Sequence, residues 1–199
     1  MPLRVLALRV QEPAGLVCKH VPVNEAALQE LLDKQAVHEC VLRYCRGIDR
    51  MDAELVRSCY HADATDEHGA FLGTRDVFVD WVMDAIAQFT VTMHVVANHL
   101  CELDEHDRDV AYAETYGLAY HQGPPPDDKR RNFVTGFRYV DRFERRDSVW
   151  RIARRVTARE WTQHILAEQL WEIRPERDGR RGARDRSDAV YTIREEQQT

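Results

Sequence analysis

Residues 91–103, VTMHVVANHLCEL, are the first of four long stretches that have a period of two and are rich in β-branched and aromatic residues. The other three are DVAYAETYGLAYH (109–121), FVTGFRYVDRFER (133–145) and VWRIARRVTAREW (149–161), and the connections are DEHDR, GPPPDDKRR and RDS. A period of two is typical of strands, and short polar connections indicate hairpins. The second half of the chain therefore predicts a four-stranded antiparallel meander.

Three helical patterns precede these strands. Apolar residues recur every three to five positions from Asn24, a good N-cap, to a predicted helix end at 47–49. Asp52 can cap a short helix over AELVRSCY, and Thr74 a third helix over residues 75–88. The residues predicted to be buried in the third helix are Val77, Phe78, Trp81, Val82, Ala85 and Ile86.

The order of helices first and strands second predicts an α+β fold. HADA (61–64) is expected to turn the chain, and TDEHGAFLG (65–73) to be a short extended piece. No alternation of strands and crossover helices supports a parallel sheet. We therefore expect the helices to pack on one face of a curved, mainly antiparallel sheet.

One domain, over residues 24–165, accounts for these patterns. Residues 1–23 read as an irregular lead-in with one short strand at Leu3–Val10, and 166–199 as a charged extension. The extension begins with a short helical piece, HILAEQLWEI, and continues as RPERDGRRGARDRSD, whose six arginines and polar composition predict a mobile tail. These arginines could instead reach anionic groups on a neighbouring subunit.

Composition narrows the class of protein. The chain has 199 residues, 28 basic and 34 acidic, and a formal net charge of −6, which does not suggest a nucleic-acid or anionic-membrane surface. Five cysteines without a C-x-x-C pair or a secretory signal favour reduced thiols in the cytoplasm, with Cys40, Cys45 and Cys59 packed as small apolar residues. No phosphate loop, dinucleotide turn or H-E-x-x-H pair occurs, so we expect no cofactor and no metal.

Chemistry must then come from polar residues at positions where an apolar one is expected. His94 and Asn98 share one face of the first predicted strand and could line the concave side of a curved sheet. Tyr44 continues the buried stripe of the first helix, so its hydroxyl needs a partner or a cavity. Asp49 lies about 140° around the helix from Tyr44, but Gly47 would let the chain turn and bring the carboxylate to the same space. Each of these residues also has an ordinary structural interpretation. Tyr44 could be a core tyrosine bonded to a backbone carbonyl, Asp49 a solvated acid in a turn, and His94 a structural histidine with its hydrogen bonds made.

Further candidates for substrate contact are less specific. His68 could close one edge of the cavity, although a histidine in a surface turn needs no explanation. Arg155 could bind an anionic group, whereas Arg151, Arg154 and Arg159 are expected to face solvent. The remaining aromatic candidates are Tyr60, Tyr116, Tyr139 and Trp161.

The segments YCRGIDRMDAELVRSCYHADA, DEHGAFLG, TMHVVANHL, GFRYVDRFERRDSVWRIARR and RDRSDAVY resemble the SnoaL-like proteins of the nuclear-transport-factor-2-like superfamily, over about residues 25–190. The branch that looks closest includes scytalone dehydratase, bile-acid 7α-dehydratase and hexachlorocyclohexane dehydrochlorinase. The resemblance implies a cone-shaped α+β barrel and a catalytic pair of Asp49 and His94, with Tyr44 as a hydrogen-bond donor. Family members commonly form homodimers or homotrimers through the exposed sheet face.

The resemblance implies a cofactor-independent lyase or isomerase acting on a small, largely apolar cyclic, polyketide-like or steroid-like molecule. His94 would accept a proton while Asp49 orients it; a second version gives the proton transfer to Asp49 itself. The alternative is a non-catalytic ligand-binding module or partner subunit of the same fold, which would have a closed apolar core. No partner other than a small molecule and further copies of the chain is expected.

Overall fold

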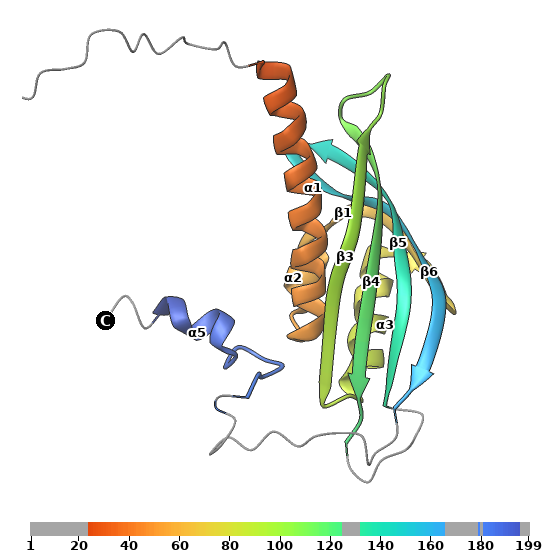
Figure 1. Ribbon diagram of the computed structural model, residues 1–199, viewed down its shortest axis with the longest axis vertical. Helices are drawn as coiled ribbons and strands as arrows, with labels where there is room; N and C mark the ends of the chain where they lie inside the picture. The colour runs from red at the N-terminus through yellow and green to blue at the C-terminus, as the bar shows by residue number, and fades with distance from the viewer. Residues whose placement is uncertain (1–23, 125–131, 166–178, 180, 196–199) are drawn as a thin grey trace, which may run out of the picture.

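The computed structural model describes residues 24–124, 132–165, 179 and 181–195 (Figure 1). The predicted lead-in, the PPPDD loop and most of the HILAEQLWEI piece lie outside these residues. The helices are α1 (Glu25–Asp49), α2 (Ala53–Ser58), α3 (Arg75–Ala87) and α5 (Ala189–Glu195). The strands are β1 (Tyr60–His68), β2 (Phe71–Thr74), β3 (Val91–Leu103), β4 (Val110–Gln122), β5 (Phe133–Arg146) and β6 (Val149–His164).

The four predicted strands form the meander β3–β4–β5–β6, as expected. Two more strands extend it, because the sheet order is β2-β1-β6-β5-β4-β3 and β1 runs parallel to β6. The predicted turn at 61–64 is therefore wrong, since these residues belong to β1. A register shift between Tyr60 and Thr65 interrupts the pairing of β1 with β6. The local sequence of β1 does not predict a strand, because pairing with β6, which is distant in the chain, stabilises it.

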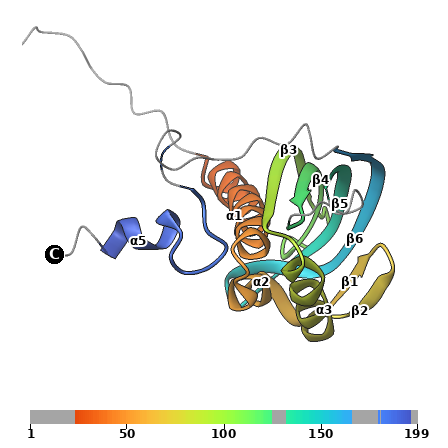
Figure 2. The same cartoon turned by 90° about the horizontal axis from the view of Figure 1, so that it is seen from below.

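Helices α1, α2 and α3 cover the concave face of the curved sheet, as Figure 2 shows from below, so the predicted α+β architecture is confirmed. The Asn24 side chain caps α1 through the Ala27 N–H at 3.2 Å, and the Asp52 side chain caps α2. Thr74 precedes α3 as predicted, but its side chain makes no capping hydrogen bond. In α3, Phe78, Val82 and Ile86 are buried, but Val77 and Trp81, which were also predicted to be buried, are 58% and 37% exposed. A four-residue periodicity alone does not show where an apolar stripe ends.

Gly47 has a different function from the one predicted. Helix α1 continues through it to Asp49, and the chain turns at Met51, which has a φ of 53°. A Cβ at position 47 would lie 2.6 Å from the Val56 side chain, so glycine allows the close approach of α2 to α1.

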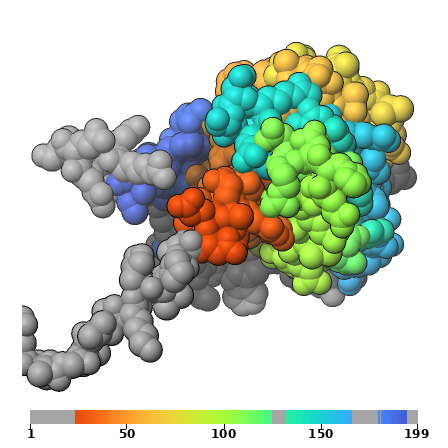
Figure 3. Space-filling model, turned by 90° about the horizontal axis from the view of Figure 1, so that it is seen from above, coloured from red at the N-terminus to blue at the C-terminus, as the bar shows by residue number. Residues whose placement is uncertain are grey.

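One end of the molecule is tied together by charged and aromatic side chains. Asp33 of α1 accepts hydrogen bonds from Trp150 Nε1 at 2.9 Å and from Arg145 at 2.8 Å, and Arg145 also contacts Asp109. Figure 3 shows this end, with the start of α1 beside the β3–β4 connection and the β5–β6 turn. The contacts hold the first half of α1 against the sheet.

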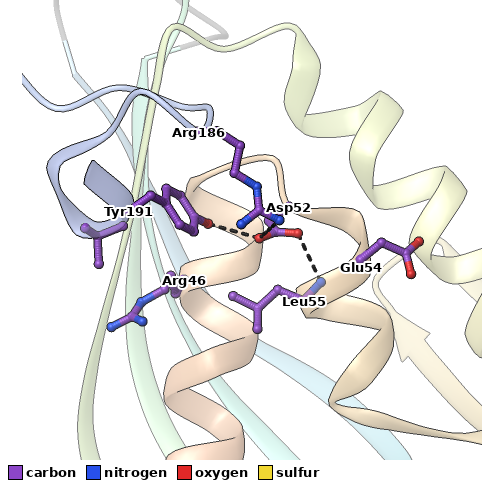
Figure 4. Close-up of a pocket in the computed structure, with 7 residues that line it drawn as sticks. Arg46, Asp52, Glu54, Leu55, Arg186 and Tyr191 are labelled. Atoms are coloured by element: carbon purple, nitrogen blue, oxygen red, sulfur yellow. Dashed lines mark hydrogen bonds and ion pairs between the residues drawn. The ribbon is translucent and has the colours of Figure 1, made fainter. Parts of the chain in front are cut away.

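The C-terminal segment 181–193 packs against the C-terminal end of α1. The prediction of a mobile tail is therefore wrong for these residues. Tyr191 donates from its hydroxyl to Asp52 at 3.0 Å, and Arg186 lies 3.0 Å from the same carboxylate (Figure 4). Arg184 donates to the backbone carbonyls of Ile86, at 3.0 Å, and Phe89. One arginine of this segment therefore binds the carbonyls at the end of α3.

The described cysteines pack as predicted. Cys40, Cys45, Cys59 and Cys101 are buried free thiols, and Cys40 donates to the carbonyl of Cys59. No helix in the described part of the chain is long and apolar enough to cross a bilayer.

Candidate active site

Asp49 and His94 form a closely held pair at the junction of α1 and β3. Asp49 Oδ1 lies 2.7 Å from His94 Nδ1, and Oδ2 accepts the His94 backbone N–H at 2.9 Å. Both side chains are largely buried, with 12% and 9% exposure respectively. A carboxylate can only accept, so Nδ1 carries the proton and the lone pair of the neutral imidazole is on Nε2.

His94, and not Asp49, lines a cavity on the inner side of the sheet. This cavity encloses about 200 Å³ between α1, α3 and the concave face of the sheet, and His94 is part of its lining. Asp49 lies behind the imidazole and lines a separate surface hollow together with it. No described residue hydrogen-bonds to Nε2, which leaves this atom for a bound molecule.

Most of the cavity wall is apolar or aromatic. Besides His94, the lining comprises Tyr44, Ile48, His68, Trp81, Val82, Ala85, Ile86, Gln88, Phe89, Ala119, His121, Phe133, Thr135, Phe137, Tyr139, Thr157 and Arg159. Arg159, which was expected to face solvent only, contributes at the rim. A mainly apolar wall with polar groups set into it is typical of a site for a small organic molecule.

His121 of β4 is a second histidine next to His94 that the sequence reasoning missed. The two rings meet edge to face with centroids 6.1 Å apart, and His121 stacks on Phe133 at 4.5 Å. Burial, and then the neighbouring His94, lowers the pKa of His121 to about 4. His121 is therefore neutral at physiological pH, and its buried Nδ1 has no hydrogen-bond partner among the described residues.

Tyr44 and Tyr139 contribute to the cavity lining, as predicted, and a buried cation supports them from behind. The Arg155 guanidinium lies 4.3 Å from the Tyr44 ring centroid and 3.9 Å from that of Tyr139. Arg155 makes two 2.7 Å hydrogen bonds to Asp141, and both side chains are fully buried. Burial raises the pKa of both phenols, so they remain hydrogen-bond donors at neutral pH.

Two other predicted substrate contacts lie behind the cavity wall. Tyr60 is buried and donates its hydroxyl to Asp66 at 2.6 Å, and neither Tyr60 nor Arg155 lines the cavity. Arg155 therefore cannot bind an anionic substrate, because its charge is committed to Asp141 within the core.

Asn98 is not beside His94, because β3 is irregular. The pairing with β4 shifts between Val96 and His99, so one extra residue reverses which side chains face inward. Asn98 consequently lies in a hollow on the convex face of the sheet.

Tyr116 and Trp161 line the same convex hollow and are 42% and 47% exposed. A second shift, between the Gly136–Trp161 and Phe137–Arg159 pairs, turns Trp161 outward. The predicted contacts Asn98, Tyr116 and Trp161 are therefore together, but on the face opposite the cavity.

Within the described residues, no three His, Cys, Asp or Glu side chains are grouped so that they could hold a metal ion. The polar groups available in the cavity are three histidines, two tyrosine hydroxyls, two threonine hydroxyls, the Gln88 amide and the Arg159 guanidinium.

Solved structures with the same fold include proteins of several kinds. A candidate scytalone dehydratase from Novosphingobium aromaticivorans is 18% identical, with 74% of this chain and 93% of that chain covered and a TM-score of 0.62. Hexachlorocyclohexane dehydrochlorinase LinA-type3 from Novosphingobium barchaimii is 16% identical over 74% and 99% of the two chains, with a TM-score of 0.64. A protein of unknown function from Mycobacterium tuberculosis is 23% identical over 70% and 76%, with a TM-score of 0.55.

At these identities the structures show a shared fold only. No curated protein matches the chain. The family model of the SnoaL-like domain matches residues 29–156, which is most of the domain, and the chain therefore belongs to the SnoaL-like domain family, within the nuclear-transport-factor-2-like superfamily.

Proposed function

We propose that this protein is a cofactor-independent lyase or isomerase in which His94 removes a proton from a carbon of a small cyclic substrate. The observation that carries the proposal is that Asp49 holds Nδ1 of His94, while the His94 side chain lines the cavity and Asp49 does not. The dehydratase and dehydrochlorinase among the structural neighbours, both named for eliminations, agree with it.

In this reaction His94 Nε2 accepts the proton of an activated C–H group. Asp49 stabilises the imidazolium that forms and fixes the ring through its second bond to the His94 backbone N–H. Tyr44 and Tyr139 can donate hydrogen bonds to an oxygen that gains negative charge. Such donors act more strongly in a dry cavity than in water.

The volume of the cavity limits the size of the substrate. A cavity of about 150 Å³ can hold benzene, so about 200 Å³ accommodates one substituted six-membered ring. A complete steroid-like skeleton would not be enclosed, although one ring of it could enter. We therefore propose a monocyclic ketone or phenol-like compound, or the terminal ring of a larger molecule.

The version in which Asp49 transfers the proton has less support. Asp49 does not line the cavity, and both its oxygens are bound to His94. For the non-catalytic alternative, the cavity would bind a ring without activating its C–H bonds.

The test is exchange of the α-hydrogens of cyclohexanone for deuterium in D₂O, followed by NMR. We expect the wild-type protein to accelerate exchange and His94→Gln to lose at least about 100-fold, the usual contribution of a general base. Asp49→Asn should lose at least about tenfold, because an amide can present its NH₂ group to Nδ1 and favour the wrong tautomer.

His99→Gln is the matched control, because His99 is also a half-buried histidine of β3 but bonds Thr115 and does not line the cavity. Its exchange rate should equal that of the wild type. Equal rates in His94→Gln and wild type would contradict the proposal, and cyclohexanone binding without exchange would favour the binding module.

A further inference from the structure

Arg159 of β6 places a positive charge at the rim of the cavity. Alternate residues of a strand share a face, so Arg159 lies on the same face of β6 as Arg155 and Thr157. Arg155 is fully buried, whereas Arg159 is exposed and lines the cavity together with Thr157. Of the two arginines on this face, Arg159 is therefore the one that a bound molecule can reach.

The Arg159 guanidinium has no carboxylate partner within the described residues. The neighbouring acid, Glu160, accepts a hydrogen bond from Arg138 at 2.6 Å and lines the convex hollow instead. Nη2 of Arg159 lies 3.6 Å from the point where a Cβ would stand at Gly69, in the turn between β1 and β2. Neither neighbour neutralises the charge of Arg159, which leaves it available to an anionic group.

The charge balance of the cavity wall favours such a group. Arg159 is the one lysine or arginine among the described residues that line the cavity, and no aspartate or glutamate is among them. The wall next to it is mainly apolar, and a charge beside apolar walls acts over a medium of lower dielectric constant than open water. A ligand with an apolar ring at one end and a negative charge at the other therefore matches the cavity.

We propose that Arg159 binds a carboxylate of the substrate, and that the substrate class is monocyclic ketones with a carboxylate substituent. This inference deepens the proposed function and rests on it. Arginine suits the role because its planar guanidinium donates two parallel hydrogen bonds to a carboxylate. His94 and Arg159 line the same cavity of about 200 Å³, so one molecule can present its ring to His94 and its carboxylate to Arg159.

Binding of benzoate and of benzamide, measured by isothermal titration calorimetry, tests the preference for an anion. The two molecules have nearly the same shape, but only benzoate is charged, and neither has a hydrogen that the proposed reaction removes. We expect the wild type to bind benzoate at least about fivefold more tightly, because a charged donor makes a strong hydrogen bond that solvent partly screens at the rim. The ratio of the two affinities should fall to about one in Arg159→Gln and lie between these values in Arg159→Lys.

Arg154→Gln is the matched control. Arg154 is also an exposed arginine of β6, but it lines a hollow on the opposite face of the sheet with Leu100 and Tyr112. Its ratio of benzoate to benzamide affinity should equal that of the wild type. Equal affinities of the wild type for the two molecules, or an Arg159→Gln protein that keeps the preference, would overturn the inference.

Hydrogen exchange separates this inference from the proposed function. We expect kcat/KM of the wild type to be at least about fivefold higher for 4-oxocyclohexanecarboxylate than for cyclohexanone, and the two values to be about equal in Arg159→Gln. The difference should lie in KM, because Arg159 binds a part of the substrate that does not react. Exchange of both ketones with equal kcat/KM in the wild type would overturn this inference and leave the proposed function. A preference for benzoate without exchange of either ketone would keep Arg159 as an anion site and contradict the proposed function.

Discussion

At the scale of single residues, His121 shows how the cavity controls ionisation. It is packed against Phe89 and Phe133, so its charged form would lose hydration without gaining a carboxylate partner. Burial lowers its pKa from about 6.5 to about 4. The neutral ring keeps the cavity beside His94 free of a second positive charge.

This lowered pKa predicts acid sensitivity. Unfolding raises the pKa of His121 from about 4 to about 6.5, so the unfolded chain binds this proton more tightly. The contribution of His121 to the free energy of unfolding is therefore fully present above about pH 6.5 and decreases as the pH falls toward about 4. At about 1.4 kcal/mol for each pKa unit, the loss reaches roughly 3 kcal/mol. Replacing His121 by phenylalanine should make the free energy of unfolding less dependent on pH.

Urea unfolding at about pH 7.5 and about pH 5 measures this effect. His106→Gln changes an exposed loop histidine and should leave the pH dependence as in the wild type. The same pH dependence in His121→Phe and wild type would contradict the assignment.

A residue-level signal for His121 was present in the sequence. On β4 it shares a face with Ala111, Ala113 and Ala119, while the tyrosines Tyr112, Tyr116 and Tyr120 alternate with them. The concave face has to leave space for helices and a cavity, so small residues mark it. The alternation therefore places His121 on the concave face and Tyr116 on the convex face.

At the scale of elements, the C-terminal segment connects the ends of two helices beside the site. Arg184 donates to carbonyls at the end of α3 and approaches the Asp49 carbonyl at 3.4 Å. Carbonyls at a helix C-terminus lack intrahelical donors, so a charged donor there is stabilising. The segment therefore supports the helix end that carries the dyad.

Arg184→Gln should lower the free energy of unfolding by about 1–3 kcal/mol, the usual contribution of hydrogen bonds from a charged group. We also expect slower cyclohexanone exchange, because Asp49 loses a support. Thermal unfolding and NMR exchange measure the two effects. Arg181→Gln, at an exposed position of the same segment, is the control and should change neither. An Arg184→Gln protein as stable and active as wild type would show that the segment does not support the site.

At the scale of the whole molecule, the convex face of the sheet is rich in exposed apolar residues. Met93, Val95, Leu100, Tyr112, Tyr116, Tyr120, Val140 and Trp161 are between 36% and 59% exposed. Clusters of this kind mark interaction surfaces. We predict that copies of the chain associate through this face.

The double variant Leu100→Glu with Val140→Glu tests the association, because buried charges at an interface are costly. Sedimentation should show an oligomer for the wild type and a monomer for the variant. Val77→Glu, at an exposed apolar position of α3, should leave the mass unchanged. If the wild type sediments as a monomer, the convex face is not a self-association surface.

The sequence by itself determined the α+β class, the meander and the caps of α1 and α2, because periodicity and capping are local properties. The resemblance to a family, not a local pattern, implied the pair of Asp49 and His94. Tertiary structure decided the rest. The shifts near Ala97 and Glu160 reversed the faces of Asn98 and Trp161, and pairing with β6 created β1, which brings His68 to the cavity. Faces and partners of this kind depend on hydrogen bonds between segments far apart in the chain, which a local pattern does not contain.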